Sequence, residues 1–188
     1  HLFKLETGRK DWNAALPALD VMARQQKKTK SKTAPDRLAL ITRQACALHF
    51  LKASELQESD RKSADKKLLT ALKIDPGFLP AVTMLADHYL DDKAHGRAAK
   101  ILETAFKIHP HDSIATRQKI AWKSNDGQFI AKLSKLLAQI DSSQKKTAHF
   151  LVARQARDAG LDGEAERLFS AARDLDGGEE DAQSLWHC

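Results

Sequence analysis

The sequence is poor in the residues from which several common kinds of site and fold are built. Of 188 residues, two are cysteine, one is tyrosine, five are proline and eight are glycine. Cys46 and Cys188 lie far apart, which excludes a disulfide framework, and we expect Cys46 to be a small buried residue of an apolar helix. No run of β-branched and aromatic residues predicts a strand. No apolar stretch reaches the roughly eighteen residues that suggest a membrane helix.

Motifs for catalysis and cofactor binding are missing as well. The chain has no glycine-rich phosphate or dinucleotide loop, no GxSxG and no HExxH or CxxC. Its eight histidines lack the spacing of a zinc site, and we expect those beside turns, such as His109 and His111, to lie on the surface. The pair Asp91-Asp92 is predicted to be an exposed turn. We therefore expect no catalytic residue, no metal and no cofactor.

The net charge of +6 is concentrated near the beginning of the chain, because residues 1–62 hold 13 basic and 7 acidic side chains. Lys27 to Lys32 belong to a polar segment, 25–36, which we interpret as a solvated loop between helices. Binding of this loop to an anionic surface is the alternative. Aromatic residues are not interleaved with these lysines, so nucleic-acid binding is not expected.

The segment 79–110 contains two amphipathic helices separated by a short polar break. Counted from Leu79, its apolar and small residues occupy positions 4, 7, 8, 11, 20, 24 and 27, and a proline stands at 32. This spacing is that of a tetratricopeptide repeat (TPR), a helix–turn–helix unit of about 34 residues. Small side chains at Ala86, Ala98 and Ala105 are predicted where the two helices cross closely.

The boundary of this unit recurs along the chain. The three residues at 74–76 have counterparts at 108–110, 140–142 and 175–177, at intervals of 34, 32 and 35 residues. One repeat cannot bury its apolar face alone, so neighbouring repeats are expected to stack. The fold predicted for residues 1–188 is a single all-α domain, a right-handed TPR solenoid of antiparallel helix pairs with about ten helices.

The predicted repeats differ in how well they keep the pattern. Segments 79–110 and 146–177 keep it best. Segment 111–144 is degenerate, with Leu137 where alanine is expected. Segment 37–76 is a stretched repeat, because its polar loop at 55–62 is longer than the pattern allows.

A repeat solenoid binds its partners on the concave face formed by the first helix of each pair. Residues of those helices that lie off the packing stripe are therefore the candidate site: Thr83, Asp87, Phe150, Arg154 and Arg157. An exposed Phe150 between two arginines can anchor a partner segment and its carboxylates. The alternative is that Phe150 belongs to the core of a divergent repeat.

The run 71–115 resembles the HemY family of bacterial inner-membrane TPR proteins. The resemblance is carried by Ala99, Leu102, Glu103, Ala105, Pro110 and His111, by the opening GRKDWNAAL at 8–16, and by the break at 125–127. It implies a cytoplasmic scaffold behind N-terminal membrane helices that are not in this sequence. It also implies an association with haem and porphyrin biosynthesis, with late haem-pathway enzymes as protein partners. No functional residue of the family carries over to a position here.

Two other functions stay open beside a scaffold for haem synthesis. One is a TPR assembly factor or co-chaperone for components of the cell envelope. The other is a carrier that holds haem or a porphyrin in the groove, although an axial ligand must face an apolar pocket and the histidines are expected at turns. The oligomeric state is left open.

Overall fold

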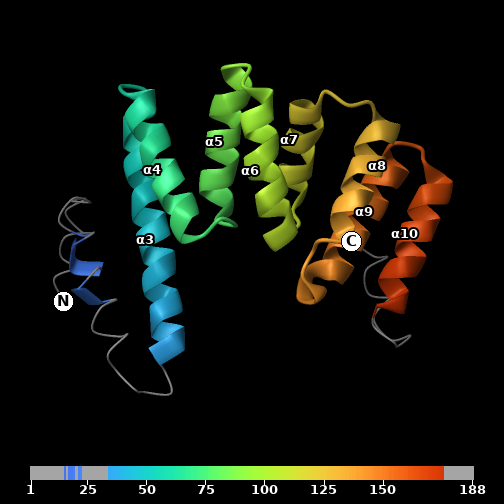
Figure 1. The fold of residues 1–188 in the computed structure, drawn as a ribbon, viewed down its shortest axis with the longest axis horizontal. Helices are drawn as coiled ribbons and strands as arrows, with labels where there is room; N and C mark the ends of the chain where they lie inside the picture. Colours follow the sequence, from blue (N-terminus) through green and yellow to red (C-terminus); the bar gives the residue numbers. More distant parts are fainter. Residues whose placement is uncertain (1–14, 16, 20, 23–33, 176–188) are drawn as a thin grey trace. The chain divides into compact units, whose positions relative to one another are not determined.

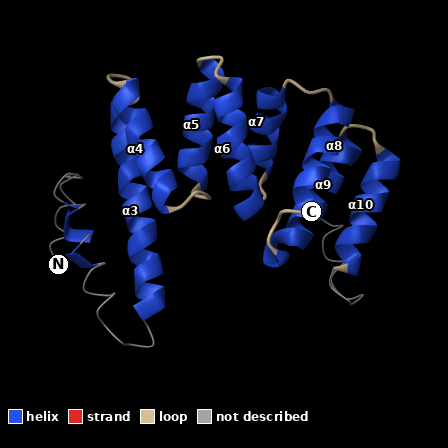
Figure 2. Cartoon of the chain, in the orientation of Figure 1, coloured by secondary structure: helices blue, strands red, loops and turns tan. Residues whose placement is uncertain are grey.

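The computed structural model describes residues 15, 17–19, 21, 22 and 34–175. Figures 1 and 2 show that this part of the chain is built from helices and contains no strand. The helices bounded within it are α3 (Ala34–Leu56), α4 (Arg61–Ile74), α5 (Leu79–Asp91), α6 (His95–Ile108), α7 (Asp112–Trp122), α8 (Asp126–Leu137), α9 (Ser142–Asp158) and α10 (Asp162–Asp174). None of the described helices is both long and apolar enough to cross a membrane.

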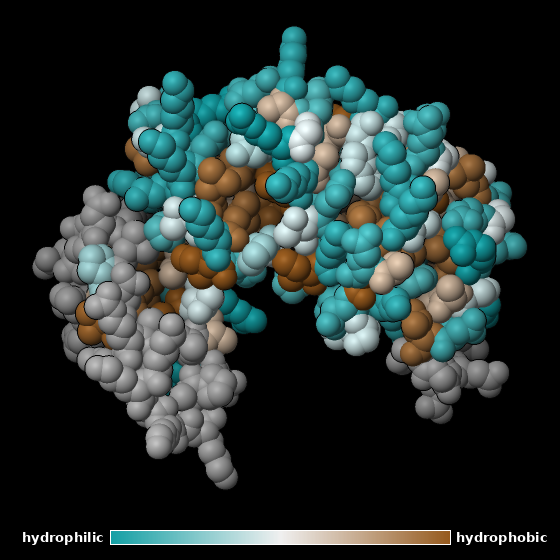
Figure 3. Space-filling model, in the orientation of Figure 1, coloured by the Kyte–Doolittle hydropathy of each residue, from teal (hydrophilic) through white to brown (hydrophobic). Residues whose placement is uncertain are grey.

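The chain divides into two compact units, His1–Leu85 and Ala86–Cys188. In the first unit α3 packs on α4, and in the second α6 packs on α7, α8 on α9 and α9 on α10. Helices joined by a short turn run in opposite directions (Figure 1). On the face seen in Figure 3, hydrophilic side chains cover most of α8–α10, with smaller apolar patches between them. The prediction of an all-helical protein with packed neighbouring helices is confirmed.

The positions that predicted the repeat are core positions. In segment 79–110 the small residues of the pattern, Ala86, Ala98 and Ala105, are completely buried. Their counterparts in segment 146–177 are at most 3% exposed: Ala153, Ala165 and Ala172. A methyl group at these points lets two helix backbones approach more closely than a larger side chain would.

The degenerate segment 111–144 fills the same space with larger residues. Leu137, which replaces the expected alanine, is 5% exposed. Gln118 stands where the two better repeats have Ala86 and Ala153, and it is completely buried. Neither its amide nitrogen nor its amide oxygen has a hydrogen-bond partner within the described part of the chain. An unpaired buried amide is destabilising, so Gln118 lowers the stability of this segment.

The loop predicted in segment 37–76 is shorter than expected. The sequence predicted a loop over 55–62, but α3 continues to Leu56 and α4 begins at Arg61. Asp60 caps α4 by accepting a 3.0 Å hydrogen bond from the Ser63 backbone nitrogen, and the hydrogen bonds from Ser63 lower the pKa of the Asp60 carboxyl. The extra length lies in the 23-residue helix α3. The sequence predicted a longer loop because polar residues at an exposed helix end resemble a loop.

Cys46 lies in the core of the first unit, as predicted. It is completely buried, and its Sγ lies 3.6 Å from the carbonyl oxygen of Ala71. Burial, followed by the nearby charge of Asp75, raises the pKa of the Cys46 thiol to about 11. The thiol is therefore neutral and unreactive at ordinary pH.

Two residues that precede α3 in the chain pack against it. Ala15 and Leu19 are buried against Ile41 and Leu48 of α3, whereas Met22 is 38% exposed. The lysines of the segment 25–36 lie outside the described residues.

The first helices of three pairs end in the same hydrogen-bonded turn. After α9 the Leu161 nitrogen donates to the Ala156 oxygen and the Gly160 nitrogen to the Arg157 oxygen, both at 2.9 Å, which is a Schellman motif. The same two bonds follow α5 and α7. The residue with positive φ is Gly160 (71°) after α9, but Lys93 (58°) and Lys123 (49°) after α5 and α7. Lys93 and Gly160 both stand at position 15 of their repeats.

We expect Ala153→Leu to lower the free energy of unfolding by about 1–3 kcal/mol, because the added carbons have no space where α9 meets its neighbours. Ala131→Leu on the exposed face of α8 is the matched control and should stay within about 0.5 kcal/mol of the wild type. Urea unfolding followed by circular dichroism measures both. Equal losses in the two variants would contradict close packing at Ala153.

The Schellman turns allow two substitutions that should change the free energy of unfolding in opposite directions. Gly160→Ala should lower the free energy of unfolding by about 1–2 kcal/mol, because a Cβ disfavours positive φ. Lys93→Gly should raise it by up to about 1 kcal/mol for the same reason. Thermal melting of both variants and the wild type measures these changes. A stabilised Gly160→Ala protein would show that the turn does not require this backbone conformation.

Candidate functional site

A cleft of about 600 Å³ opens in the second unit, lined by the beginning of α7 and by side chains of α9 and α10. Helix α9 contributes Lys146, Phe150, Arg154 and Arg157. These residues are spaced at intervals of three and four, which places them along one face of the helix. The cleft thus joins an apolar surface to a row of basic side chains.

Two phenylalanine rings form the apolar part of the cleft. The centroids of Phe150 and Phe169 lie 5.9 Å apart and their planes are tilted by 52°. The Lys146 Nζ lies 5.9 Å from the centroid of Phe150, and the Arg157 guanidinium carbon lies 5.9 Å from that of Phe169. Each ring is therefore in contact with a cation through its face. Both rings stay partly accessible to solvent.

One carboxylate faces the basic row. Asp112, in the first turn of α7, forms an ion pair through Oδ2 with Nη2 of Arg154. Its other oxygen accepts a 3.3 Å hydrogen bond from Nε2 of Gln155. Both charged side chains are about half exposed, at 45% and 48%, so water screens their attraction. The positive end of the α7 dipole also favours a carboxylate at this place.

His111 lies at the rim of the cleft as the N-cap of α7. Its Nδ1 accepts a 3.2 Å hydrogen bond from the backbone nitrogen of Ser113 and lies 2.8 Å from the Ser113 hydroxyl. An Nδ1 that accepts a hydrogen bond leaves the proton of a neutral imidazole on Nε2. The prediction that His109 and His111 are exposed turn residues is confirmed.

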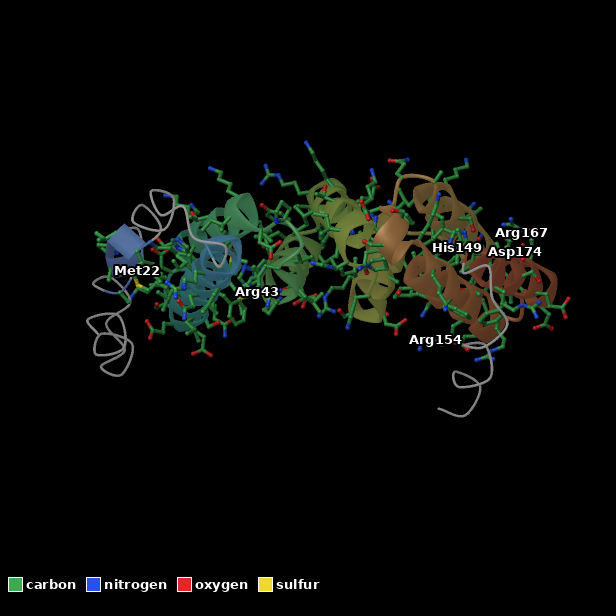
Figure 4. All side chains as sticks on the ribbon, turned by 90° about the horizontal axis from the view of Figure 1, so that it is seen from below. Met22, Arg43, His149, Arg154, Arg167 and Asp174 are labelled. Atoms are coloured by element: carbon green, nitrogen blue, oxygen red, sulfur yellow. The ribbon has the colours of Figure 1, made fainter. Side chains whose placement is uncertain are left out.

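The structure brings three of the five predicted site residues together. Phe150, Arg154 and Arg157 line the cleft, and Figure 4 shows Arg154 extending away from the helices of its unit. Phe150 was interpreted either as an exposed anchor for a partner or as a core residue. Its half-buried ring packs on Phe169 and also borders the cleft, so it has features of both.

Thr83 and Asp87 do not line this cleft. The Thr83 hydroxyl donates to the carbonyl oxygen of Leu79, one turn earlier in its own helix, at 3.0 Å. Both carboxylate oxygens of Asp87 accept 2.7 Å hydrogen bonds from the guanidinium of Arg117. Asp87 therefore links α5 to α7, as Asp112 and Arg154 link α7 to α9.

The lining residues that the sequence analysis missed include Phe169, Asp112 and Lys146. Phe169 stands at position 24 of segment 146–177, which the repeat pattern assigns to the core. Asp112 lies 42 residues from Arg154, so no local spacing relates them. Lys146 was detectable, because it precedes Phe150 by one helical turn on the same face.

No family model matches this sequence, and a search of curated proteins finds no match. The resemblance to HemY proteins therefore stays a prediction. Within the described residues no group of three or more histidine, cysteine, aspartate or glutamate side chains is placed to hold a metal ion.

Proposed function

We propose that this chain is a non-catalytic, TPR-like scaffold that binds a segment of a partner protein in the cleft of α9 and α10. The observation that carries the proposal is the Phe150–Phe169 pair, partly exposed beneath Lys146 and Arg157. Aromatic and arginine side chains dominate the energetics of protein interfaces.

Two features support the TPR-like arrangement. The small residues that let helices cross closely recur at matching positions in segments 79–110 and 146–177 and are buried in both. The turn that ends the first helix also recurs, with positive φ at Lys93 and Gly160. Recurrence of both the packing position and the turn is what a tandem repeat requires.

The cellular setting we propose follows from the resemblance of segment 71–115 alone. It is a parent protein anchored in the bacterial inner membrane, with this region on the cytoplasmic side and late haem-pathway enzymes as partners. A TPR assembly factor for envelope components would use the same cleft for different partners.

Affinity capture from a bacterial membrane lysate tests the proposal. The baits are the wild-type chain, Arg154→Ala/Arg157→Ala, and the control Arg167→Ala/Arg173→Ala, which removes the same charge. Arg167 lies on the other side of its unit from Arg154 in Figure 4. We expect the cleft variant to lose a specific partner by roughly tenfold or more, as for interface hot spots, and the control to keep it.

The identity of the captured proteins separates the alternatives. Late haem-pathway enzymes that depend on the cleft support the haem scaffold, and envelope-assembly proteins support the other setting. Equal capture by all three baits contradicts binding at the cleft. Melting curves of the three proteins show whether any loss reflects unfolding.

Porphyrin binding is a second candidate, favoured by one observation: His111 stands at the rim of a cleft that combines apolar rings with basic side chains. Against it, Nδ1 of His111 accepts the hydrogen bond that caps α7. Ligation of iron through Nε2 would move the proton to Nδ1 and break this cap.

We therefore expect no Soret shift when haem is added to the wild-type chain. The comparison is His111→Asn, because asparagine is itself a good N-cap and should preserve α7. A Soret shift in the wild type that disappears in His111→Asn would contradict our expectation and establish His111 as a haem ligand.

A further inference from the structure

The charges that line the cleft favour an anionic occupant. Lys146, Arg154 and Arg157 supply three positive charges, and Asp112 is the one acidic side chain among the lining residues. Complementary charge directs a partner to such a surface and fixes its orientation. The cleft is also confined to about 600 Å³, whereas single-stranded nucleic acids usually bind along extended basic grooves. A short acidic peptide segment suits this size and charge.

The rings indicate what that segment must carry. Phe150 and Phe169 are tilted by 52° at 5.9 Å, a geometry that a third aromatic ring can join edge to face. The Arg157 guanidinium carbon lies 5.9 Å from the centroid of Phe169. A guanidinium carries five N–H donors in a fork, so it can bind a carboxylate while it stays beside the ring. An aromatic residue next to acidic residues would use both features at once.

The ion pair of Asp112 with Arg154 occupies part of this site. An incoming carboxylate competes with Asp112 for the same guanidinium. The exchange costs little, because both partners are about half exposed and such pairs are weak. After the exchange Asp112 keeps two favourable interactions. Gln155 Nε2 lies 3.3 Å from its Oδ1, and the N-terminus of α7 favours its negative charge.

We infer that the cleft binds an acidic segment with one aromatic side chain, and that Asp112 is an internal competitor that the segment displaces from Arg154. The inference rests on the proposed function and specifies the chemistry of the partner segment. The aromatic side chain packs against Phe150 and Phe169. The carboxylates beside it bind Arg154 and Arg157.

The test uses the full 188-residue chain and a fluorescein-labelled twelve-residue peptide of Asp, Glu, Gly and Ser with one central Phe, followed by anisotropy. Asp112→Asn should raise the affinity about two- to fivefold, because it removes a competitor of the strength of an exposed ion pair. Asp126→Asn is the matched control, since Asp126 also begins a helix and pairs with a basic side chain, Lys119. It should leave the affinity unchanged.

The peptide itself is varied in parallel. Replacing its Phe by Ser, or its acidic residues by Asn and Gln, should each weaken binding by roughly tenfold, as loss of an anchor does at an interface. Arg157→Ala should do the same, and binding should weaken as salt is added. Equal affinity for an oligothymidylate of twelve nucleotides would overturn the choice of an acidic peptide.

The outcomes separate this inference from the proposed function. An unchanged affinity in Asp112→Asn overturns the competition, and tight binding of the uncharged peptide overturns the acidic segment. If no peptide binds but the Arg154/Arg157 variant still loses its captured partner, the chemistry inferred here is wrong and the scaffold stands. If neither peptide binding nor partner capture depends on these arginines, both this inference and the proposed function are wrong.

Discussion

The close approach of helices through buried alanines is the constraint on which the rest of the structure depends. Ala98, Ala105, Ala153 and Ala172 are all completely buried, so neighbouring helices are held at a distance that only a methyl group fits. This spacing sets where the other faces of each helix lie. On α9 it leaves the row from Lys146 to Arg157 at the surface of the cleft.

Polar contacts that link α5 to α7 and α7 to α9 add specificity to this packing. Asp87 on α5 is paired with Arg117 on α7, and Asp112 on α7 is paired with Arg154 on α9. Each pair is partly exposed, so it contributes little to stability. Its effect is to define which polar side chains meet between α5 and α7 and between α7 and α9. The same arrangement places an acidic residue inside the cleft, where structural and binding roles compete for Arg154.

The sequence was sufficient to predict features that repeat and insufficient for those that do not. The helix pairs and their buried small residues follow from a period that recurs in segments 79–110 and 146–177. The loop expected at 55–62 covers only 57–60, because a polar exposed helix end and a loop have the same composition. In the cleft, Phe150, Arg154 and Arg157 share one helix face and could be found together. Asp112 comes from another helix, and only the fold brings it to Arg154.

The buried amide of Gln118 has a consequence for how the second unit loses its structure. Proteins open locally with free energies that vary along the chain, and opening is easiest where buried groups are least satisfied. Gln118 has no hydrogen-bond partner within the described part of the chain, so opening α7 exposes its amide to water and costs less than it would with an apolar residue at this position. The same helix begins with Asp112, on one wall of the cleft. A partner that contacts both α7 and α9 in the cleft would therefore oppose this opening, and its affinity would be coupled to the local stability of α7.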